Sequence, residues 1–155
     1  MTAIRILVDA DACPVKEEIY KVAFRCGVAA SIVSNSFIRV PEHPLVSRVA
    51  VGAAFDAADD WIAAEADAKS VVVTGDILLA DRALKKGAVV LAPNGKAFTA
   101  DSIGGQIAAR AIMADLRAGA GVLGEGGGGP PPFSKSDRSR FLEALDAAIV
   151  RLRKT

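Results

Sequence analysis

The side chains of this chain that could do chemistry are aspartates near the ends of apolar segments. One pair follows the apolar run 4–8, another aspartate follows the run 71–74 after a single glycine, and a further group precedes that second run. The acids that we assign to one candidate site are Asp9, Asp11, Asp56, Asp59 and Asp76. Carboxylates that converge within a few ångströms repel one another, which raises their pKa values or recruits a cation. Without a His or Cys pair nearby, such oxygen ligands suit Mg²⁺ or Mn²⁺ rather than Zn²⁺.

Each aspartate also has a structural explanation. Asp is common at helix N-caps, where its side chain accepts hydrogen bonds from free backbone N–H groups. Asp9 and Asp11 are two positions apart, so both need not cap the same helix. Asp76 follows Gly75, which lets the chain turn sharply. Each acid taken alone is better explained as a helix cap, but the acids taken together are better explained as a metal site.

The elements that must position these acids alternate between strand and helix. The β-branched run 4–8 predicts a buried strand, and residues 14–26 predict a helix with Pro14 at its first position and Gly27 as its stop. Further strands are predicted at 30–34, 46–51, 71–74 and 89–91, and further helices at 57–67 (capped by Asp56), 77–86 and 103–118. This order predicts a mostly parallel sheet with helices on both faces. In such a sheet, ligands bind outside the carboxyl ends of the strands.

The chain closes with a helix that follows a low-complexity segment. Residues 119–133 are rich in Gly and Pro, which predicts a linker or a lid. Ser134 and Asp137 have the spacing of a capping box, and a stripe of four apolar residues predicts a helix within 134–155 that docks on the core. We therefore predict a single domain over residues 1–155, with its α/β core at 1–118.

Composition and charge exclude several classes of protein. The chain is 52% hydrophobic but only 5% aromatic, which predicts a core of Ala, Val, Ile and Leu. No run approaches the roughly 20 apolar residues that span a membrane, and the N-terminus does not fit a secretory signal. Two cysteines are too few for a disulfide framework, so we expect a cytoplasmic protein. The net charge of +1 gives no global signature of nucleic-acid binding.

Basic side chains are more frequent than acidic ones in residues 104–155, whereas acids outnumber bases before that point. Five of these basic residues could bind phosphate: Arg110, Arg117, Lys135, Arg138 and Arg140. Solvated surface charge explains them equally well. Cys13 could have a lowered thiol pKa at a helix N-terminus, but no base partner is apparent, and we prefer a buried or capping thiol. His43, in a Pro-flanked loop, is expected to be exposed and without a role.

Four segments resemble a known family: VDADACP, FDAADDWI, VVTGDILLA and GGPPPFSKSDRSRF. They are similar to the YaiI/YqxD family of uncharacterised bacterial proteins, and the resemblance covers nearly the whole chain. That family is in turn similar to PIN-like nuclease domains, three-layer α/β/α folds that hold Mg²⁺ or Mn²⁺ with strand-end acids and cleave RNA. The resemblance implies this fold, with a C-terminal helix after the Gly/Pro-rich segment. It also implies ligand roles for Asp9, Asp11, Asp56, Asp59 and Asp76, whereas Asp60 and Asp81 match no acid of the family.

The sequence thus predicts a divalent-metal-dependent nuclease acting on RNA phosphodiesters, in which ions activate a bound water and stabilise the leaving oxygen. One alternative is a haloacid-dehalogenase-type phosphatase with Asp9 as nucleophile and Asp11 as general acid. That family needs a lysine between its threonine and its final acids, whereas Thr74 and Asp76 are two residues apart. Another alternative is a nucleic-acid-binding module without turnover. The sequence predicts no oligomeric state.

Overall fold

The computed structural model describes residues 3–11, 13–52, 54, 56–120 and 133–154. The strands within them are β1 (Arg5–Asp9), β2 (Ala29–Ser34), β3 (Val46–Ala50), β4 (Ser70–Val73), β5 (Val89–Leu91) and β6 (Ala97–Phe98). The helices are α1 (Lys16–Cys26), α2 (Ala57–Glu65), α3 (Ile77–Lys85), α4 (Ala100–Ala120) and α5 (Lys135–Arg153). The strands form one sheet in the order β3-β2-β1-β4-β5-β6, in which β1 to β5 are parallel and β6 is antiparallel to β5.

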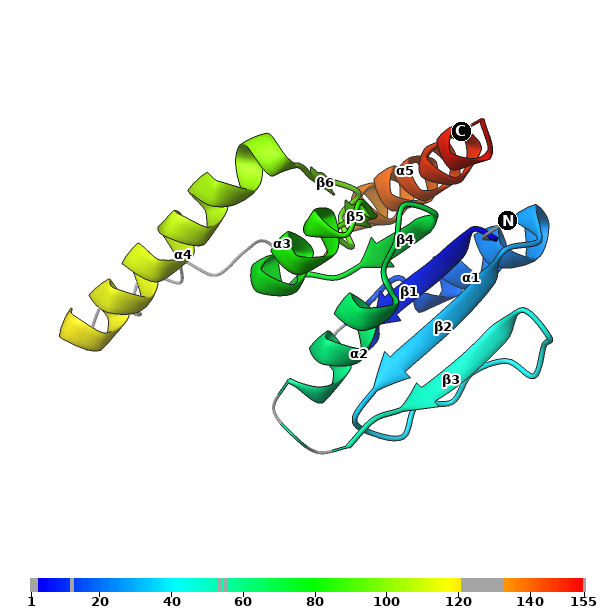
Figure 1. The fold of residues 1–155 in the computed structure, drawn as a ribbon, viewed down its shortest axis with the longest axis horizontal. Helices are drawn as coiled ribbons and strands as arrows, with labels where there is room; N and C mark the ends of the chain where they lie inside the picture. The colour runs from blue at the N-terminus through cyan, green and yellow to red at the C-terminus, as the bar shows by residue number, and fades with distance from the viewer. Residues whose placement is uncertain (1–2, 12, 53, 55, 121–132, 155) are drawn as a thin grey trace.

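Helices cover both faces of this sheet (Figure 1). Successive side chains of a strand point to opposite faces, so Ile6 and Val8 of β1 pack with α1 and α5, whereas Leu7 packs with α2 and α3. All three side chains are fully buried. The protein is therefore a three-layer α/β/α structure with a mostly parallel sheet, which confirms the fold class that the alternation of elements predicts.

Element boundaries differ from the prediction at a few places. Pro14 is not the first residue of α1, because the helix begins at Lys16 with Val15 at the N-cap position. Gly27 ends the helix as predicted, in the left-handed conformation with φ 67°. Strand β6 escaped prediction because two residues carry no readable alternation. It returns from β5 through a turn in which Gly95 has φ 90° and donates its N–H to the Ala92 carbonyl (2.9 Å).

Helix α5 docks on the same face of the sheet as α1. Its predicted capping box is present: Ser134 Oγ accepts from the Asp137 N–H (3.2 Å), and Asp137 Oδ2 accepts from the Ser134 N–H (3.0 Å). The apolar stripe that faces the core is Phe141, Leu145, Ile149 and Leu152. Residues 121–132 lie outside the described residues, so the linker or lid stays a prediction. None of the described helices is long and apolar enough to cross a membrane.

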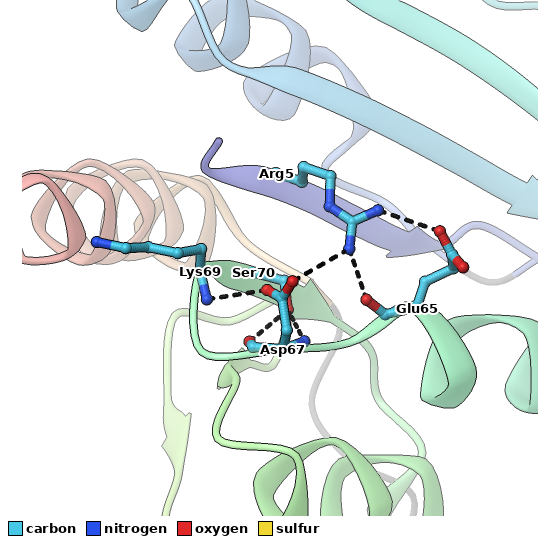
Figure 2. Close-up of polar contacts among 5 residues, drawn as sticks. All are labelled: Arg5, Glu65, Asp67, Lys69 and Ser70. Atoms are coloured by element: carbon cyan, nitrogen blue, oxygen red, sulfur yellow. Dashed lines mark hydrogen bonds and ion pairs between the residues drawn. The ribbon is translucent and has the colours of Figure 1, made fainter. Parts of the chain in front are cut away.

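A polar network at the amino ends of β1 and β4 fixes one end of α2 (Figure 2). The Arg5 guanidinium donates to Glu65 Oε1 (3.1 Å) and to the Glu65 carbonyl oxygen (2.5 Å), and lies 3.6 Å from Asp67 Oδ2. Hydrogen bonds within residues 67–70 close the turn into β4. Because this end of α2 is anchored, its other end is held at the carboxyl edge of the sheet, where the candidate acids lie.

Candidate functional site

Two adjoining hollows open at the carboxyl ends of β1 and β4. Their volumes are about 420 and about 440 Å³, and both are lined by Asp9, Asp11 and Asp76. Asp56 and Asp59, at the N-terminal end of α2, also line the second hollow. We call the two hollows together the acidic crevice. The tertiary structure brings all five candidate acids to the edge of the sheet where ligands of parallel sheets bind.

Asp9 ends β1 and is tied to the segment after β4 by one buried hydroxyl group. Thr74 Oγ1 donates a hydrogen bond to Asp9 Oδ2 (2.8 Å) and accepts one from the N–H of Asp76 (3.0 Å). Burial raises the pKa of the Asp9 carboxyl, and the Thr74 hydrogen bond partly opposes this shift. Repulsion from Asp11 and Asp76 raises the pKa further. Asp9 is therefore held in one orientation where its negative charge is unfavourable.

Asp11 is exposed, but the end of β2 holds its carboxylate. Oδ1 accepts hydrogen bonds from Ser34 Oγ (2.5 Å) and Ser36 Oγ (3.3 Å), and Oδ2 accepts one from the Asn35 N–H (3.5 Å). These contacts join the segment after β1 to the loop after β2. The second acid of the candidate site is thus oriented by groups that come from the neighbouring strand.

Asp76 serves as the N-cap of α3 while it lines the crevice. Its Oδ1 accepts from the N–H groups of Leu78 (2.8 Å) and Leu79 (3.3 Å). Asp76 therefore both caps α3 and lines the crevice. Asp56 differs: it occupies the N-cap position of α2, but its side chain makes no capping hydrogen bond. The predicted position of Asp56 at the start of α2 is confirmed, but the capping hydrogen bond is not present, and the side chain lines the crevice.

Among the crevice acids, Asp59 has the most strongly raised pKa. Burial is the largest cause that raises its pKa to about 6, and repulsion from Asp76, Asp9 and Asp56 adds to it. Arg82 opposes the shift. Because three other crevice acids contribute to the pKa of Asp59, their charges interact across the crevice.

The donor chemistry of the crevice fits a hard divalent cation, since all five side chains offer carboxylate oxygens. Among the described residues, no group of three or more His, Cys, Asp or Glu side chains is arranged to hold a metal ion. The carboxylates are spread over the walls, as expected for like charges that repel. An ion would therefore require these side chains to approach one another more closely.

Comparison with known proteins identifies the family. A family model described as "Uncharacterized BCR, YaiI/YqxD family" matches residues 7–151. The chain belongs to the YaiI/YqxD family. A "UPF0178 protein" of Sphingopyxis alaskensis is 70% identical over 99% of this chain and 98% of its own length. Relatives from Nitrobacter winogradskyi (58% identical; 99% and 96% covered) and Jannaschia sp. (57%; 96% and 94%) carry the same name. No solved structure matches the chain.

The basic residues that the sequence suggested for phosphate do not line the crevice where their side chains are described. In this YaiI/YqxD protein, Arg138 donates to Glu18 Oε1 (2.8 Å) and to the Pro14 carbonyl (2.7 Å), and Arg140 donates to Asp137 (2.5 Å). Lys135, Arg138 and Arg140 line neither hollow of the crevice. The side chains of Arg110 and Arg117 lie outside the described residues.

Sequence reasoning missed Arg82 and the hydroxyl groups that orient the acids. Arg82 lines the second hollow and donates to Asp60 Oδ1 (2.9 Å). It lies in the last turn of α3, where a cation is ordinary and gives no signal of a site, and only the packing of α2 against α3 brings it to the acids. The sequence did carry a signal for Thr74 and Ser34, because each is a hydroxyl residue at the carboxyl end of an apolar strand. In the structure they contact Asp9 and Asp11.

Cys13 is buried and His43 is exposed, as expected. The Cys13 thiol is buried at the wall of the first hollow, and burial raises its pKa, which disfavours the reactive thiolate. His43 is exposed; its ring lies 4.3 Å from the ring of Phe24, and its Nδ1 accepts from the Leu45 N–H.

Proposed function

We propose that this YaiI/YqxD protein is a divalent-metal-dependent nuclease that hydrolyses RNA phosphodiesters at the acidic crevice. The observation that supports this proposal is the convergence of five aspartates from the carboxyl end of β1 and the N-terminal ends of α2 and α3 on one crevice. Burial there, together with repulsion from the other acids, raises the pKa of Asp59 to about 6. A cation relieves the repulsion in such a cluster. The crevice is also open, as a polymeric substrate requires.

The residues that would hold Mg²⁺ or Mn²⁺ are Asp9, Asp11, Asp56, Asp59 and Asp76. A bound ion of this kind supplies an activated water and stabilises charge on the leaving oxygen. The chain's own contribution is orientation. Thr74 fixes Asp9, the hydroxyls of Ser34 and Ser36 fix Asp11, and the cap of α3 fixes Asp76. Supporting hydrogen bonds of this kind set the orientation of ligand side chains.

The resemblance of the family motifs to PIN-like nuclease domains supports the same reaction class. We propose further that the substrate is RNA in the cytoplasm. Cys13 and Cys26 are both free thiols, as suits a reducing compartment. The phosphatase alternative has less support, because no lysine lines either hollow among the described residues. The binding-module alternative keeps the same crevice and differs only in turnover.

One assay panel separates these three functions. The purified protein is incubated with a labelled oligoribonucleotide and, separately, with a small phosphomonoester, each in Mg²⁺, Mn²⁺ or EDTA. We expect cleavage of the oligoribonucleotide in Mn²⁺ or Mg²⁺ and none in EDTA, with Asp9→Asn inactive and Asp101→Asn active as the charge-matched control. Phosphate release from the phosphomonoester alone would instead identify a phosphatase. A gel shift without cleavage would identify a binding module and remove the nuclease proposal.

A further inference from the structure

The acidic crevice is also lined by polar residues other than the aspartates. The lining of its second hollow includes Asn35, after β2, and Arg82, on α3. Each of these residues borders a surface feature that the aspartates do not explain. Phe37 stands just beyond Asn35, and a basic hollow lies beyond Arg82.

Phe37 presents a flat aromatic surface to solvent. It is 77% exposed, more than any other large apolar side chain among the described residues. The guanidinium carbon of Arg48, on β3, lies 4.6 Å from the centre of its ring. An exposed ring with a cation against it can stack an unpaired base while the guanidinium neutralises a neighbouring phosphate.

Chain continuity places the backbone of Phe37 near the crevice. The residue before it, Ser36, donates its hydroxyl to Asp11 Oδ1 (3.3 Å), and Asn35 donates its N–H to Asp11 Oδ2 (3.5 Å). Two residues of backbone span at most about 7 Å, so the Cα atoms of Phe37 and Asn35 are no farther apart than that. A base next to a phosphodiester in the crevice could therefore reach the ring.

The basic hollow has a volume of about 330 Å³ and lies between α2 and α3. Its lining includes Arg82, Lys85 and Lys86, and Arg82 is shared with the crevice. Arg82 pairs with Asp60 (2.9 Å) and Lys85 with Asp81 (3.1 Å). Exposed pairs of this kind contribute little stability, so a phosphate can compete for both cations.

We propose that Phe37, the acidic crevice and the basic hollow form one track for a single-stranded polynucleotide. A base stacks on Phe37, and backbone phosphates contact Arg82, Lys85 and Lys86. The inference rests on the proposed function and adds the form of the substrate, because the ring can stack only with a base that is not already paired in a duplex. It also supplies the cations that hold a polyanion next to five carboxylates.

Simpler explanations exist for each end of the track. Arg82 and Lys85 lie in the last turn of α3, where cations stabilise the helix dipole, and single exposed apolar side chains are common. If these explanations were complete, substitution of these residues would not change the affinity for nucleic acid. The test is therefore the affinity for a fluorescent single-stranded oligoribonucleotide, measured by anisotropy in EDTA and in Mg²⁺ at several salt concentrations, with the matching duplex as competitor.

The variants separate the two ends of the track. Phe37→Ala should weaken binding by about fivefold or more without changing the salt dependence, and Phe37→Trp should bind as well as wild type. The pair Lys85→Gln and Lys86→Gln should reduce the slope of log affinity against log salt by about 0.7 for each phosphate that the variant no longer neutralises. Lys21→Gln with Lys96→Gln is the charge-matched control; neither residue lines the crevice or the basic hollow, and the slope should not change.

Several results would overturn the track. They are unchanged binding by Phe37→Ala, failure of Phe37→Trp to bind, an equal slope change in the control pair, or tighter binding of the duplex. A change in oligomeric state on Phe37→Ala, seen by size-exclusion chromatography, would make the ring a protein contact instead. If wild type cleaves RNA in Mn²⁺ but these variants behave like it, only the track is wrong. If wild type neither binds nor cleaves RNA, the proposed function fails too.

Discussion

Asp76 caps α3 with Oδ1 and lines the acidic crevice with the same carboxylate. The two tasks can be separated by substitution. Asn caps a helix about as well as Asp but carries no charge, whereas Ala neither caps the helix nor carries a charge. In EDTA, Asp76→Asn should melt no lower than wild type, and Asp76→Ala should lose about 0.5–2 kcal/mol of stability. In Mn²⁺ both should show a smaller upward shift in melting temperature than wild type.

Thermal melts of the three proteins in EDTA and in Mn²⁺ check this prediction. Asp101→Asn is the control, since this exposed acid of α4 lines neither hollow of the crevice. Equal Mn²⁺ shifts in wild type and Asp76→Asn would remove Asp76 from the site.

Asp59 should make stability depend on pH. Its pKa is about 6 in the folded protein, against an ordinary value of 3.8. Between these values the folded state binds a proton more readily than the unfolded state, so stability should fall as pH rises through this window and stay lower above it. Asp59→Asn should raise stability above pH 6 by about 1 kcal/mol at most, because solvent screens this partly exposed group.

Urea unfolding from about pH 4 to about pH 8, which brackets the ordinary and the raised carboxyl pKa, checks the Asp59 prediction. The variant should show a flatter profile than wild type. A variant profile that matches that of wild type across this window would show that the pKa of Asp59 is not raised in the folded protein.

The turn between β5 and β6 is a place where two elements approach too closely for a side chain. Gly95 has φ 90°, and a Cβ at this position would lie 2.7 Å from the Arg140 backbone in α5. Gly95→Ala should therefore destabilise the protein by about 1–3 kcal/mol. Gly104→Ala, in α4 where a Cβ meets nothing within 4 Å, should be neutral or stabilising by up to about 1 kcal/mol. Similar losses from both substitutions in urea unfolding would contradict this account of the turn.

The contact between α5 and α1 depends on a charge that is nearly buried. Glu18 is 7% exposed, and Arg138 is its partner at 2.8 Å. Arg138→Met should cost about 1–3 kcal/mol, because it leaves the carboxylate without its ion-pair partner. Adding Glu18→Gln should recover part of that loss, which urea unfolding of the single and double variants measures. Strictly additive losses would show that the two residues do not act as a pair.

The whole molecule should respond to the ion through its folding equilibrium. A cation that binds only the folded state at about 100 times its Kd adds roughly 2.7 kcal/mol, enough to raise the melting temperature by several degrees. We expect this rise for wild type in Mn²⁺ or Mg²⁺, and its reversal by EDTA. Calorimetry over a range of ion concentrations checks it, and a melting temperature independent of the ion would argue against any metal site in the crevice.

Most elements of the fold could be predicted from the sequence because their signals are local. Apolar runs such as 71–74 identify buried strands, and Gly27 and the Ser134 capping box mark helix ends through backbone chemistry. The edge at which Asp9 and Asp76 meet also follows from sequence, since strands joined by helices run parallel and their carboxyl ends coincide. What escaped prediction at this level was β6, which is too short to show a pattern.

Only the tertiary structure decided which side chains surround the aspartates. Thr74 reaches Asp9, and Ser34 reaches Asp11, because parallel register aligns the ends of β1, β2 and β4. Arg82 joins the crevice through the packing of α2 on α3, a contact between helices that no periodicity encodes. The acids are thus determined by sequence, whereas the groups that orient them and shift their pKa values depend on distances set by packing across the sheet.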